Sequence, residues 1–415
     1  MKCEVRFRYK LRTERFKKIN LLLFLFLLII LQACTTNKEV VNISVKDIPE
    51  QIEIGAFNDA GIKFVIEYSN GQIVEEEVTE STIPEEYRHY LYEEGEHSFS
   101  FLYKGIEVNF KFTMCGKSKP MTTIPTYVEN GMTYINIGRY PQTVVDDNNL
   151  ISILDTISTT NSLGYIEYDG EEYKKIISNP DGDDYTFING NIIKRNVTYY
   201  FKVEPIKWRV LYQDNNEYTL LCEMLLDNTN YYHMHNWNRS VNGKIINSNN
   251  YKYSNVRAWL NGYDGTTYDV EDYTNIGFYD VAFTEEEKLL INKTLVDNSP
   301  SSTEIMTNPN VCEDTNDYLY LLSYKDVTNP LYGFESSQSS TDTREAIVSD
   351  YARAKYCYMN LTEFYYGKGY WWLRSPTYIN SIHVPLVNYI GKVCDNFDVT
   401  FEDVAVRPAM KITLE

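Results

Sequence analysis

The segment "GYWWLRSP" near the C-terminus combines residue types that could bind a sugar or another surface ligand. In an extended strand, neighbouring side chains point to opposite faces, so Tyr370, Trp372 and Arg374 would share one face. Aromatic rings pack against the C–H patches of sugars, and a guanidinium beside them donates hydrogen bonds to hydroxyl or carboxylate groups. These three residues are therefore candidate ligand-binding residues. Trp371 and Leu373, on the other face, are predicted to lie in the core.

A second interpretation of the same segment is that both of its faces are buried. Arg374 would then pair with an internal carboxylate, and the two tryptophans would fill both sides of the sheet. Arg407, in the late segment "VRPAM", allows the same two interpretations and would lie near Arg374 if the late strands pair. Arg407 is therefore the fourth candidate ligand-binding residue.

Three aspartates in "NPDGDDYTFINGN" are the candidate ligands for a metal ion, namely Asp181, Asp183 and Asp184. Clustered oxygen ligands suit calcium, which takes about six to eight of them. The spacing lacks the last glutamate of an EF-hand loop, and Asp, Asn and Gly also dominate ordinary turns. Apart from this calcium candidate, the sequence predicts no cofactor.

The histidines and cysteines form no recognisable catalytic motif. His233 and His235 would share one face of a strand and could hold zinc only with a third ligand, so a surface histidine pair is the simpler interpretation. The sequence contains no HExxH, GxSxG or CxxC motif. Beyond the first 34 residues, the cysteines are Cys115, Cys222, Cys312, Cys357 and Cys394. Their odd number and wide spacing favour buried free thiols and leave one disulfide open.

The first 33 residues are predicted to be an export signal rather than part of a fold. Eight basic residues precede the apolar run "LLLFLFLLIIL", which is shorter than the roughly 20 residues of a membrane-spanning helix. The following "LQAC" resembles the lipobox of bacterial lipoproteins, which implies that Cys34 becomes the lipidated first residue. The alternative is an uncleaved anchor. Both interpretations predict an exported protein that is held on the membrane and faces outside the cytoplasm.

The net charge argues against nucleic acid as a partner. The chain has a formal charge of −19, which becomes about −25 when the signal segment, with its net charge of +6, is removed. Binding to nucleic acid requires a basic face that neutralises phosphates. A surplus of acidic residues is instead typical of a solvated surface.

Alternating apolar residues predict a small β domain at residues 47–115, after a tether at 34–46. Asn70-Gly71 and Lys104-Gly105 each separate two alternating segments, as the tight turns of β-hairpins do. Short strands without helical periodicity predict a β-sandwich. The closing strands resemble those of bacterial immunoglobulin-like domains, and this resemblance implies a spacer.

After a proline-containing linker at 116–130, residues 131–415 mix strand and helix patterns, which predicts an α+β domain. The segment "PIKWRVLYQDNNEYTLLCEMLL" is predicted to be a hairpin, and "VAVRPAMKITL" a late strand. Three short helices are expected, opened by Ser254, Thr284 and Ser349 as capping residues.

Eight sequence blocks of this α+β domain resemble, in the right order, a bacterial domain of unknown function, number 6273. The blocks are "INIGRYPQT", "YYFKVEPIKWRVL", "NVRAWLNG", "AFTEEEK", "YLLSYKDV", "SDYARAK", "YWWLRSP" and "VRPAM". The resemblance implies an exported or surface-attached protein and a fold distantly similar to C-type-lectin-like and formylglycine-generating-enzyme-like domains. Because fold does not fix function, it implies no particular activity.

The sequence therefore predicts a non-enzymatic, lipid-anchored surface protein in which an immunoglobulin-like spacer carries a lectin-like recognition domain. The expected ligand is a glycan or another surface protein. Two alternatives stay open, namely a surface enzyme of the formylglycine-generating or hydrolytic type and a structural component of a surface assembly.

Overall fold

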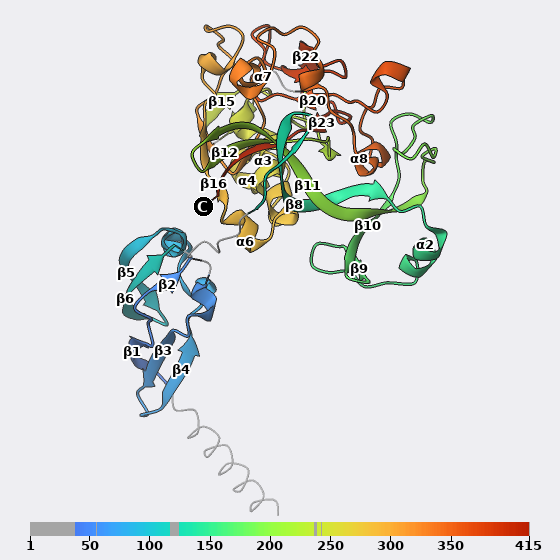
Figure 1. Cartoon of the computed structure of the whole chain (residues 1–415). Helices are drawn as coiled ribbons and strands as arrows, with labels where there is room; N and C mark the ends of the chain where they lie inside the picture. The colour runs from blue at the N-terminus through green and yellow to red at the C-terminus, as the bar shows by residue number, and fades with distance from the viewer. Residues whose placement is uncertain (1–37, 55, 117–123, 236–238, 242, 415) are drawn as a thin grey trace, which may run out of the picture. The chain divides into compact units, whose positions relative to one another are not determined.

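The computed structural model describes most of the chain after the predicted signal segment (Figure 1). The described residues are 38–414 except 55, 117–123, 236–238 and 242. The predicted signal at 1–33 and the predicted lipidation site Cys34 lie outside them. Within this part of the chain, no helix is long and apolar enough to cross a membrane.

The chain divides into two compact units, Met1–Ser118 and Lys119–Glu415. In the described part of both units, strands outnumber helices, and the helices are short. The protein is therefore a β-rich multidomain chain.

The N-terminal unit contains two three-stranded sheets, with the orders β1-β3-β4 and β2-β6-β5. All pairings in these sheets are antiparallel except that of β2 with β6. The strands and short 3-10 helices are β1 (Val40–Lys46), β2 (Ile52–Glu53), η1 (Phe57–Asp59), β3 (Lys63–Tyr68), β4 (Ile73–Glu77), η2 (Glu80–Thr82), η3 (Glu85–Tyr92), β5 (Gly95–Tyr103) and β6 (Ile106–Cys115).

The two sheets of the N-terminal unit share one aromatic core. Phe64 of β3 lies edge-on to Phe110 of β6, with 6.3 Å between the ring centroids, and both side chains are fully buried. Alternation along β5 places Phe99 and Phe101 in the same core. The predicted hairpin between β3 and β4 is present, and Gly71 in its turn has φ +80°, a conformation that glycine adopts without strain.

The N-terminal unit begins earlier than the sequence predicts. Val40–Lys46, inside the predicted tether at 34–46, form β1 and pair antiparallel with β3. Ile43 is the one fully buried side chain of this strand, so the apolar alternation along the segment is weak. Pairing with β3 supplies the order that the local sequence does not reveal.

The C-terminal unit is organised around a nine-stranded sheet. Its main path has the order β16-β24-β12-β11-β10-β9, while β8 pairs with β11, β7 with β8 and β19 with β24. Figure 1 shows the long strands β8 and β11 running through this unit. The strands are β7 (Tyr127–Glu129), β8 (Met132–Val144), β9 (Ile166–Tyr168), β10 (Glu171–Ile177), β11 (Thr198–Asp214), β12 (Glu217–Cys222), β16 (Ile291–Asn292), β19 (Leu319–Tyr320) and β24 (Ala409–Thr413).

Two predicted strand features lie in this sheet, and one predicted boundary differs. Strands β11 and β12 form the expected hairpin. The expected late strand "VAVRPAMKITL" is divided, because Ala409–Thr413 form β24 in this sheet while Ala405–Val406 form a strand of another sheet. Tyr127–Glu129, inside the predicted linker at 116–130, instead form β7 and pair with β8. The linker is therefore shorter than predicted, because pairing with β8 orders its last residues.

A second sheet of five short strands has the order β13-β23-β20-β21-β22, and two small ladders pair β14 with β15 and β17 with β18. The strands are β13 (Asp227–Asn228), β14 (Arg239–Val241), β15 (Lys244–Ile246), β17 (Thr294–Val296), β18 (Thr315–Asp317), β20 (Trp371–Trp372), β21 (His383–Val387), β22 (Val393–Asp398) and β23 (Ala405–Val406). The "YWWLRSP" segment thus supplies the central strand of the second sheet.

The helices of the C-terminal unit are short and lie between these strands. They are α2 (Asn148–Leu154), η4 (Tyr251–Tyr253), α3 (Asn255–Asn261), α4 (Gly265–Tyr268), α5 (Phe278–Ala282), α6 (Glu285–Lys288), η5 (Pro300–Ser302), α7 (Tyr324–Val327), η6 (Pro330–Tyr332), η7 (Asp342–Arg344), α8 (Asp350–Ala354) and η8 (Glu363–Tyr365). The predicted capping residues Ser254, Thr284 and Ser349 open α3, α6 and α8. Helices α6 and α8 are shorter than their sequence patterns suggest.

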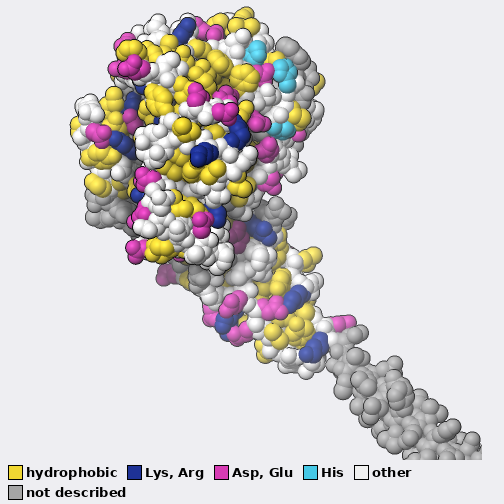
Figure 2. Space-filling model, turned by 90° about the vertical axis from the view of Figure 1, so that its right-hand side faces the viewer, with side chains coloured by type: hydrophobic (Ala, Val, Ile, Leu, Met, Phe, Trp, Pro, Cys, Tyr) yellow, Lys and Arg dark blue, Asp and Glu magenta, His cyan; other side chains and the backbone are white. Residues whose placement is uncertain are grey.

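A large apolar core connects the elements of the C-terminal unit. Trp208 of β11 and the adjacent Trp371 and Trp372 of β20 are all fully buried in it. On the face shown in Figure 2, hydrophobic side chains are mixed with charged side chains of both signs, and histidines gather in one part of the larger unit. The surface shown there has no continuous basic patch of the kind that nucleic acid requires.

Candidate binding pocket

The tryptophans of "YWWLRSP" are interior residues. Trp371, Trp372 and Leu373 are all fully buried, and β20 lies between β21 and β23. The Trp371 indole donates a hydrogen bond to the carbonyl oxygen of Arg344 at 3.1 Å, and the Trp372 indole donates to that of Thr229 at 3.0 Å. Trp371 and Leu373 thus lie in the core as predicted, and the second interpretation, in which both faces are buried, describes Trp372.

Arg374 is also buried, and its donors are used inside the protein. Its Nη1 lies 2.6 Å from the carboxylate of Asp326 and also donates a hydrogen bond to the carbonyl oxygen of Leu321 at 2.8 Å. The side chain has little exposed surface, and it lies 5.9 Å from the ring centroid of Tyr320. This is the internal ion pair of the second interpretation.

Arg407 has a comparable buried position but different partners. Its Nε donates to the carbonyl oxygen of Cys222 at 2.8 Å, and its guanidinium lies 5.1 Å from the ring centroid of Trp371. Burial, followed by the neighbouring Arg209, lowers the pKa of Arg407 to about 10. The late strands β20 and β23 pair, but Arg407 and Arg374 connect to different loops.

Tyr370 is the predicted ligand-binding residue that keeps a half-exposed side chain. It stacks on Tyr358 at a centroid distance of 4.3 Å, and Tyr389 and Phe397 lie 5.9 and 5.8 Å from it. These rings form an aromatic cluster beside the five-stranded sheet. The structure therefore separates Tyr370 from Trp372, Arg374 and Arg407, with which it was grouped in sequence.

The segment that follows Arg374 holds a second loop in place. Asn308 is buried and donates through Nδ2 to the carbonyl oxygen of Pro376 at 2.8 Å. Asn310 donates through Nδ2 to the carbonyl oxygens of Thr377, at 2.8 Å, and Asn380, at 3.0 Å. Pro376 of the motif and the residues that follow it thereby hold the loop at residues 304–313, and a pocket lies on each side of this loop.

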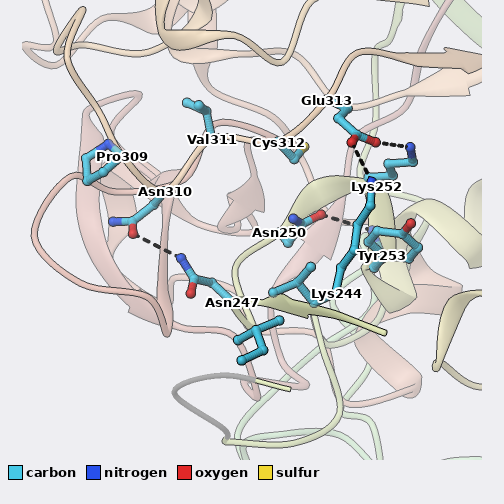
Figure 3. Close-up of a pocket in the computed structure, with 12 residues that line it drawn as sticks. Lys244, Asn247, Asn250, Lys252, Tyr253, Pro309, Asn310, Val311, Cys312 and Glu313 are labelled. Atoms are coloured by element: carbon cyan, nitrogen blue, oxygen red, sulfur yellow. Dashed lines mark hydrogen bonds and ion pairs between the residues drawn. The ribbon is translucent and has the colours of Figure 1, made fainter. Parts of the chain in front are cut away.

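The larger pocket lies between residues 244–253 and 309–313 and has a volume of about 460 Å³ (Figure 3). We call it the polar pocket. One wall comes from β15 and η4. Asn250 caps the N-terminus of η4, and its side-chain oxygen accepts a hydrogen bond from the backbone of Tyr253 at 3.3 Å. Asn247 donates through Nδ2 to Oδ1 of Asn310 at 3.1 Å and joins the two walls.

Three charged side chains meet in the polar pocket, and Figure 3 shows both lysines reaching the same carboxylate. Lys244 Nζ lies 3.0 Å from one oxygen of Glu313, and Lys252 Nζ lies 2.5 Å from the other. Hydrogen bonds from Lys252 and then from Lys244 lower the pKa of Glu313 to about 2. Glu313 is therefore ionised at all physiological pH values, and the three groups carry a net charge of about +1.

The chemistry of the polar pocket is suited to binding polar ligands. The Lys244 and Glu313 side chains are 65% and 60% exposed, while Lys252 is 28% exposed. Cys312 also lines the pocket, but burial raises the pKa of its thiol to about 11, so it stays protonated at neutral pH. The pocket thus offers ammonium, amide and carboxylate groups rather than an activated nucleophile.

The second pocket is smaller, about 170 Å³, and lies between residues 304–308 and 375–379. Its rim includes the exposed side chains of Ile305, Tyr378 and Ile379. Ser375 in its wall donates a hydrogen bond to the carbonyl oxygen of Ser302 at 2.9 Å. The loop at 304–313 therefore has a polar pocket on one side and a more apolar one on the other.

The candidate metal ligands are not assembled into a site. Asp181 accepts a hydrogen bond from Tyr185 at 3.1 Å, and Asp183 lies 3.7 Å from Arg195. Across the described residues, which include Asp184, no group of three or more His, Cys, Asp or Glu side chains is placed to hold a metal ion. The structure gives the calcium hypothesis no geometric support.

The histidines and cysteines also lie apart from the polar pocket, except Cys312. His233 Nδ1 lies 3.2 Å from Oδ1 of Asn255, whereas His235 Nδ1 lies 2.7 Å from Oδ2 of Asp398. His383 Nε2 lies 4.0 Å from the same Asp398 oxygen. The five described cysteines are free thiols. The predicted histidine pair is therefore split between two partners.

Comparison with known proteins identifies a domain family but no characterised relative. Residues 215–414 match the model of a family described as "Domain of unknown function (DUF6273)". The match supports the resemblance over six of the eight sequence blocks, from "NVRAWLNG" onward, whereas "INIGRYPQT" and "YYFKVEPIKWRVL" lie before residue 215. It includes both pockets and the "YWWLRSP" segment. No curated protein and no solved structure gave a significant match.

Sequence reasoning did not find the residues of the polar pocket. Lys252 and Glu313 are 61 residues apart, and neither belongs to a recognisable motif. The only local signal is the abundance of asparagine in "KIINSNNYKYSN", which equally indicates turns. The chain that follows the "YWWLRSP" segment contacts both walls, because Asn310 and Asn249 each donate to the carbonyl oxygen of Asn380 at 3.0 Å.

Proposed function

We propose that the protein is an exported, lipid-anchored surface protein whose C-terminal unit recognises a ligand in the polar pocket without catalysing a reaction. The N-terminal unit serves as an immunoglobulin-like spacer, and the C-terminal unit as a lectin-like recognition domain. The single observation that carries this proposal is the polar pocket. It is an open cavity of about 460 Å³ lined by charged and amide side chains from two segments.

The size and lining of the polar pocket support recognition of a small polar group. Small-molecule sites typically enclose about 300–1,000 Å³, and the polar pocket lies in the lower half of that range. Its walls are held by hydrogen bonds between Asn247 and Asn310 and between Asn310 and the chain after the buried motif. A preformed wall lowers the conformational entropy that a ligand must overcome on binding.

The state of the cysteines supports binding rather than formylglycine-type or other thiol chemistry. Burial raises the pKa of Cys222 to about 12 and that of Cys357 well above the ordinary value. A thiol attacks as its thiolate, so these residues are poor nucleophiles at neutral pH. The proposal therefore assigns no catalytic residue.

The recognition proposal is tested with the full chain purified in detergent and a broad panel of glycans, cell-wall fragments and surface proteins. We expect at least one ligand to bind, and the double variant Lys252→Ala, Asn247→Ala to lose most of that binding. The matched control is Lys207→Met, since Lys207 is 30% exposed and pairs with Glu129 at 2.7 Å outside the pocket. Binding that survives in the double variant, or absence of binding across the panel, would overturn the proposal.

The anchor is tested separately through Cys34. In cells that make the chain, Cys34→Ala should abolish labelling by a radioactive fatty acid and either release the protein or leave its precursor uncleaved. A Cys3→Ala variant is the control for the other N-terminal cysteine and should be labelled normally. Lipid labelling that persists in Cys34→Ala would contradict the anchor.

A further inference from the structure

We infer that the polar pocket selects a carboxylate-bearing sugar, a polyhydroxylated acid, over its neutral counterpart. This inference rests on the proposed function and specifies the ligand class of the same site. The starting observation is that two ammonium groups and one carboxylate meet at one end of the polar pocket, with distances of 3.0 and 2.5 Å between the paired atoms.

The charge of the polar pocket is positive at neutral pH. Lys244 and Lys252 are cationic, and Glu313 is the one acidic residue among those that line it. Cys312 is neutral at this pH, because burial raises the pKa of its thiol. The neighbouring Asp314 does not line the pocket, and one of its carboxylate oxygens accepts from the backbone of Asn298 at 2.9 Å. A cationic ligand would therefore meet two ammonium groups, whereas an anionic one would compensate the excess charge.

The lysines keep hydrogen bonds to offer to a second carboxylate. An ammonium group has three donors, and Glu313 takes one from each lysine, so two donors remain on each. Hydrogen bonds between charged groups are shorter and about twice as strong as neutral ones. A ligand carboxylate beside Glu313 would thus be bound by the same pair of side chains.

The remaining walls of the polar pocket are suited to hydroxyl groups. Asn247 and Asn250 contribute amides, and Tyr253 contributes a phenol. Amide groups both donate and accept hydrogen bonds, as sugar hydroxyls do. A ligand that combines one carboxylate with several hydroxyls therefore matches both ends of the pocket, and its size is consistent with the cavity volume of about 460 Å³.

The selection must act at short range. The chain as a whole has a formal charge of −19, so its long-range field repels anions. At physiological salt this field is screened over about 8 Å, whereas direct contacts with Lys244 and Lys252 are not. We therefore expect anion selectivity to persist at physiological ionic strength.

The test uses the full chain in detergent and four sugar acids, each paired with a neutral counterpart. The pairs are glucuronate with glucose, galacturonate with galactose, N-acetylneuraminate with its methyl ester, and N-acetylmuramate with N-acetylglucosamine. We expect calorimetry at 0.15 M salt to show at least one acid binding about tenfold or more tightly than its partner, a ratio that one charge-assisted hydrogen bond supplies. If no acid binds more tightly than its partner, the inference fails.

Two variants with opposite expected effects make the test specific. Lys252→Met should weaken binding of the acid about tenfold, and Glu313→Gln should strengthen it severalfold by removing a competing carboxylate. Lys207→Met is the matched control and should change nothing. If Glu313→Gln weakens the acid as much as Lys252→Met does, charge compensation is not the basis of selection, and the inference is overturned.

The remaining outcomes separate this inference from the proposed function. If acid and neutral sugars bind equally and Asn247→Ala weakens both, the pocket is a recognition site but the acid selectivity is wrong. If an acidic peptide binds more tightly than every sugar acid and depends on Lys252, the ligand class is a peptide and the inference is overturned. If no sugar acid binds, and every ligand found in the broader panel binds the pocket variants as tightly as the wild type, the proposed function itself fails. It fails likewise if the broader panel contains no ligand at all.

Discussion

The "YWWLRSP" segment and the polar pocket both contain strong hydrogen-bond donors but use them in opposite ways. Arg374 is buried and directs its guanidinium to Asp326 and the carbonyl oxygen of Leu321. Lys252 is 28% exposed and shares one exposed carboxylate, Glu313, with Lys244. The comparison teaches that residue type alone does not identify a binding surface. A donor is available to a ligand only where the fold has not already used it.

Buried arginines are a general feature of this C-terminal unit. Arg344 is fully buried and donates to the carbonyl oxygens of Gly391 and Val327 at 2.7 and 2.9 Å. Arg407, also fully buried, donates to that of Cys222. A fold rich in short elements leaves many loop carbonyls inside, and the five donors of a guanidinium can satisfy several at once. These arginines satisfy internal carbonyl oxygens, whereas the pocket lysines share one exposed carboxylate.

The largest predicted effect is that of replacing Arg374. In Arg374→Met, the carboxylate of Asp326 loses its cationic partner and the carbonyl oxygen of Leu321 loses a donor, while Ser323 still donates to Asp326. Breaking a buried ion pair by removing one partner typically costs about 3–5 kcal/mol, so the free energy of unfolding should fall by that amount. Urea denaturation followed by tryptophan fluorescence measures the change. If the free energy of unfolding falls by less than about 1 kcal/mol, Arg374 is not a structural residue in the sense that separates the motif from the pocket lysines.

A smaller loss of stability is expected for Trp372→Phe. The phenyl ring keeps most of the buried apolar volume but cannot donate to the carbonyl oxygen of Thr229, which the indole reaches at 3.0 Å. An unsatisfied buried acceptor costs about 1–3 kcal/mol. The same urea titration should place this variant between the wild type and Arg374→Met. If Trp372→Phe is as stable as the wild type, the hydrogen bond is not part of the structural role of the motif.

Features determined by neighbouring residues could be predicted from the sequence. Ser254 accepts from the backbone of Arg257, three residues on, and opens α3, while Gly262 ends it in the left-handed conformation. The capping box of Thr284 and Glu287 is likewise complete within three residues. Such contacts need no tertiary information, which is why both signals identified the right elements.

Features determined by distant residues could not be predicted. Strand β1 has one buried side chain, that of Ile43, and is ordered by pairing with β3. In this pairing Ile43 lies opposite Ile66, about 20 residues further along the chain. The polar pocket joins Lys252 to Glu313 across 61 residues. In the motif, period-two alternation correctly placed Trp371 and Leu373 in the core, but alternation does not tell whether the second face meets solvent or a further layer. Only the complete fold decides this.

Asn308 lies between the two regions and should affect both. Its side chain is buried and bonds to the carbonyl oxygen of Pro376, and its Oδ1 accepts from the backbone of Asn310. Asn308→Ala should therefore lower the free energy of unfolding by about 1–2 kcal/mol and also weaken ligand binding, because the wall of the polar pocket moves. Denaturation and calorimetry on the same samples test this. A variant that loses stability but keeps full binding would show that the motif does not position the pocket.

Replacing a pocket lysine should leave stability almost unchanged. The ion pair of Lys252 with Glu313 is exposed on the carboxylate side, and such surface pairs contribute little to stability because solvent screens them. Lys252→Met should thus unfold within about 0.5 kcal/mol of the wild type while losing binding. The control Lys207→Met should match it in stability and keep binding. A destabilisation like that of Arg374→Met would mean that the pocket lysine is structural as well.

The smallest effect, and the most local, is the titration of Glu313. Its folded-state pKa of about 2 is lower than its ordinary value of 4.5, because Lys252 and Lys244 donate to it. The ion pairs therefore contribute their stabilisation above pH 4.5 and lose it only as the pH falls through about 2. Carbon-detected NMR of the Glu313 carboxyl should show no titration between about pH 3 and 6 in the wild type. In Lys244→Met, Lys252→Met the midpoint should move into that range, whereas in Lys207→Met it should not. A wild-type midpoint near 4.5 would show that Lys244 and Lys252 do not form ion pairs with Glu313 in solution. The contrast between the buried Arg374, which bonds inside the protein, and the pocket lysines would then have no electrostatic basis.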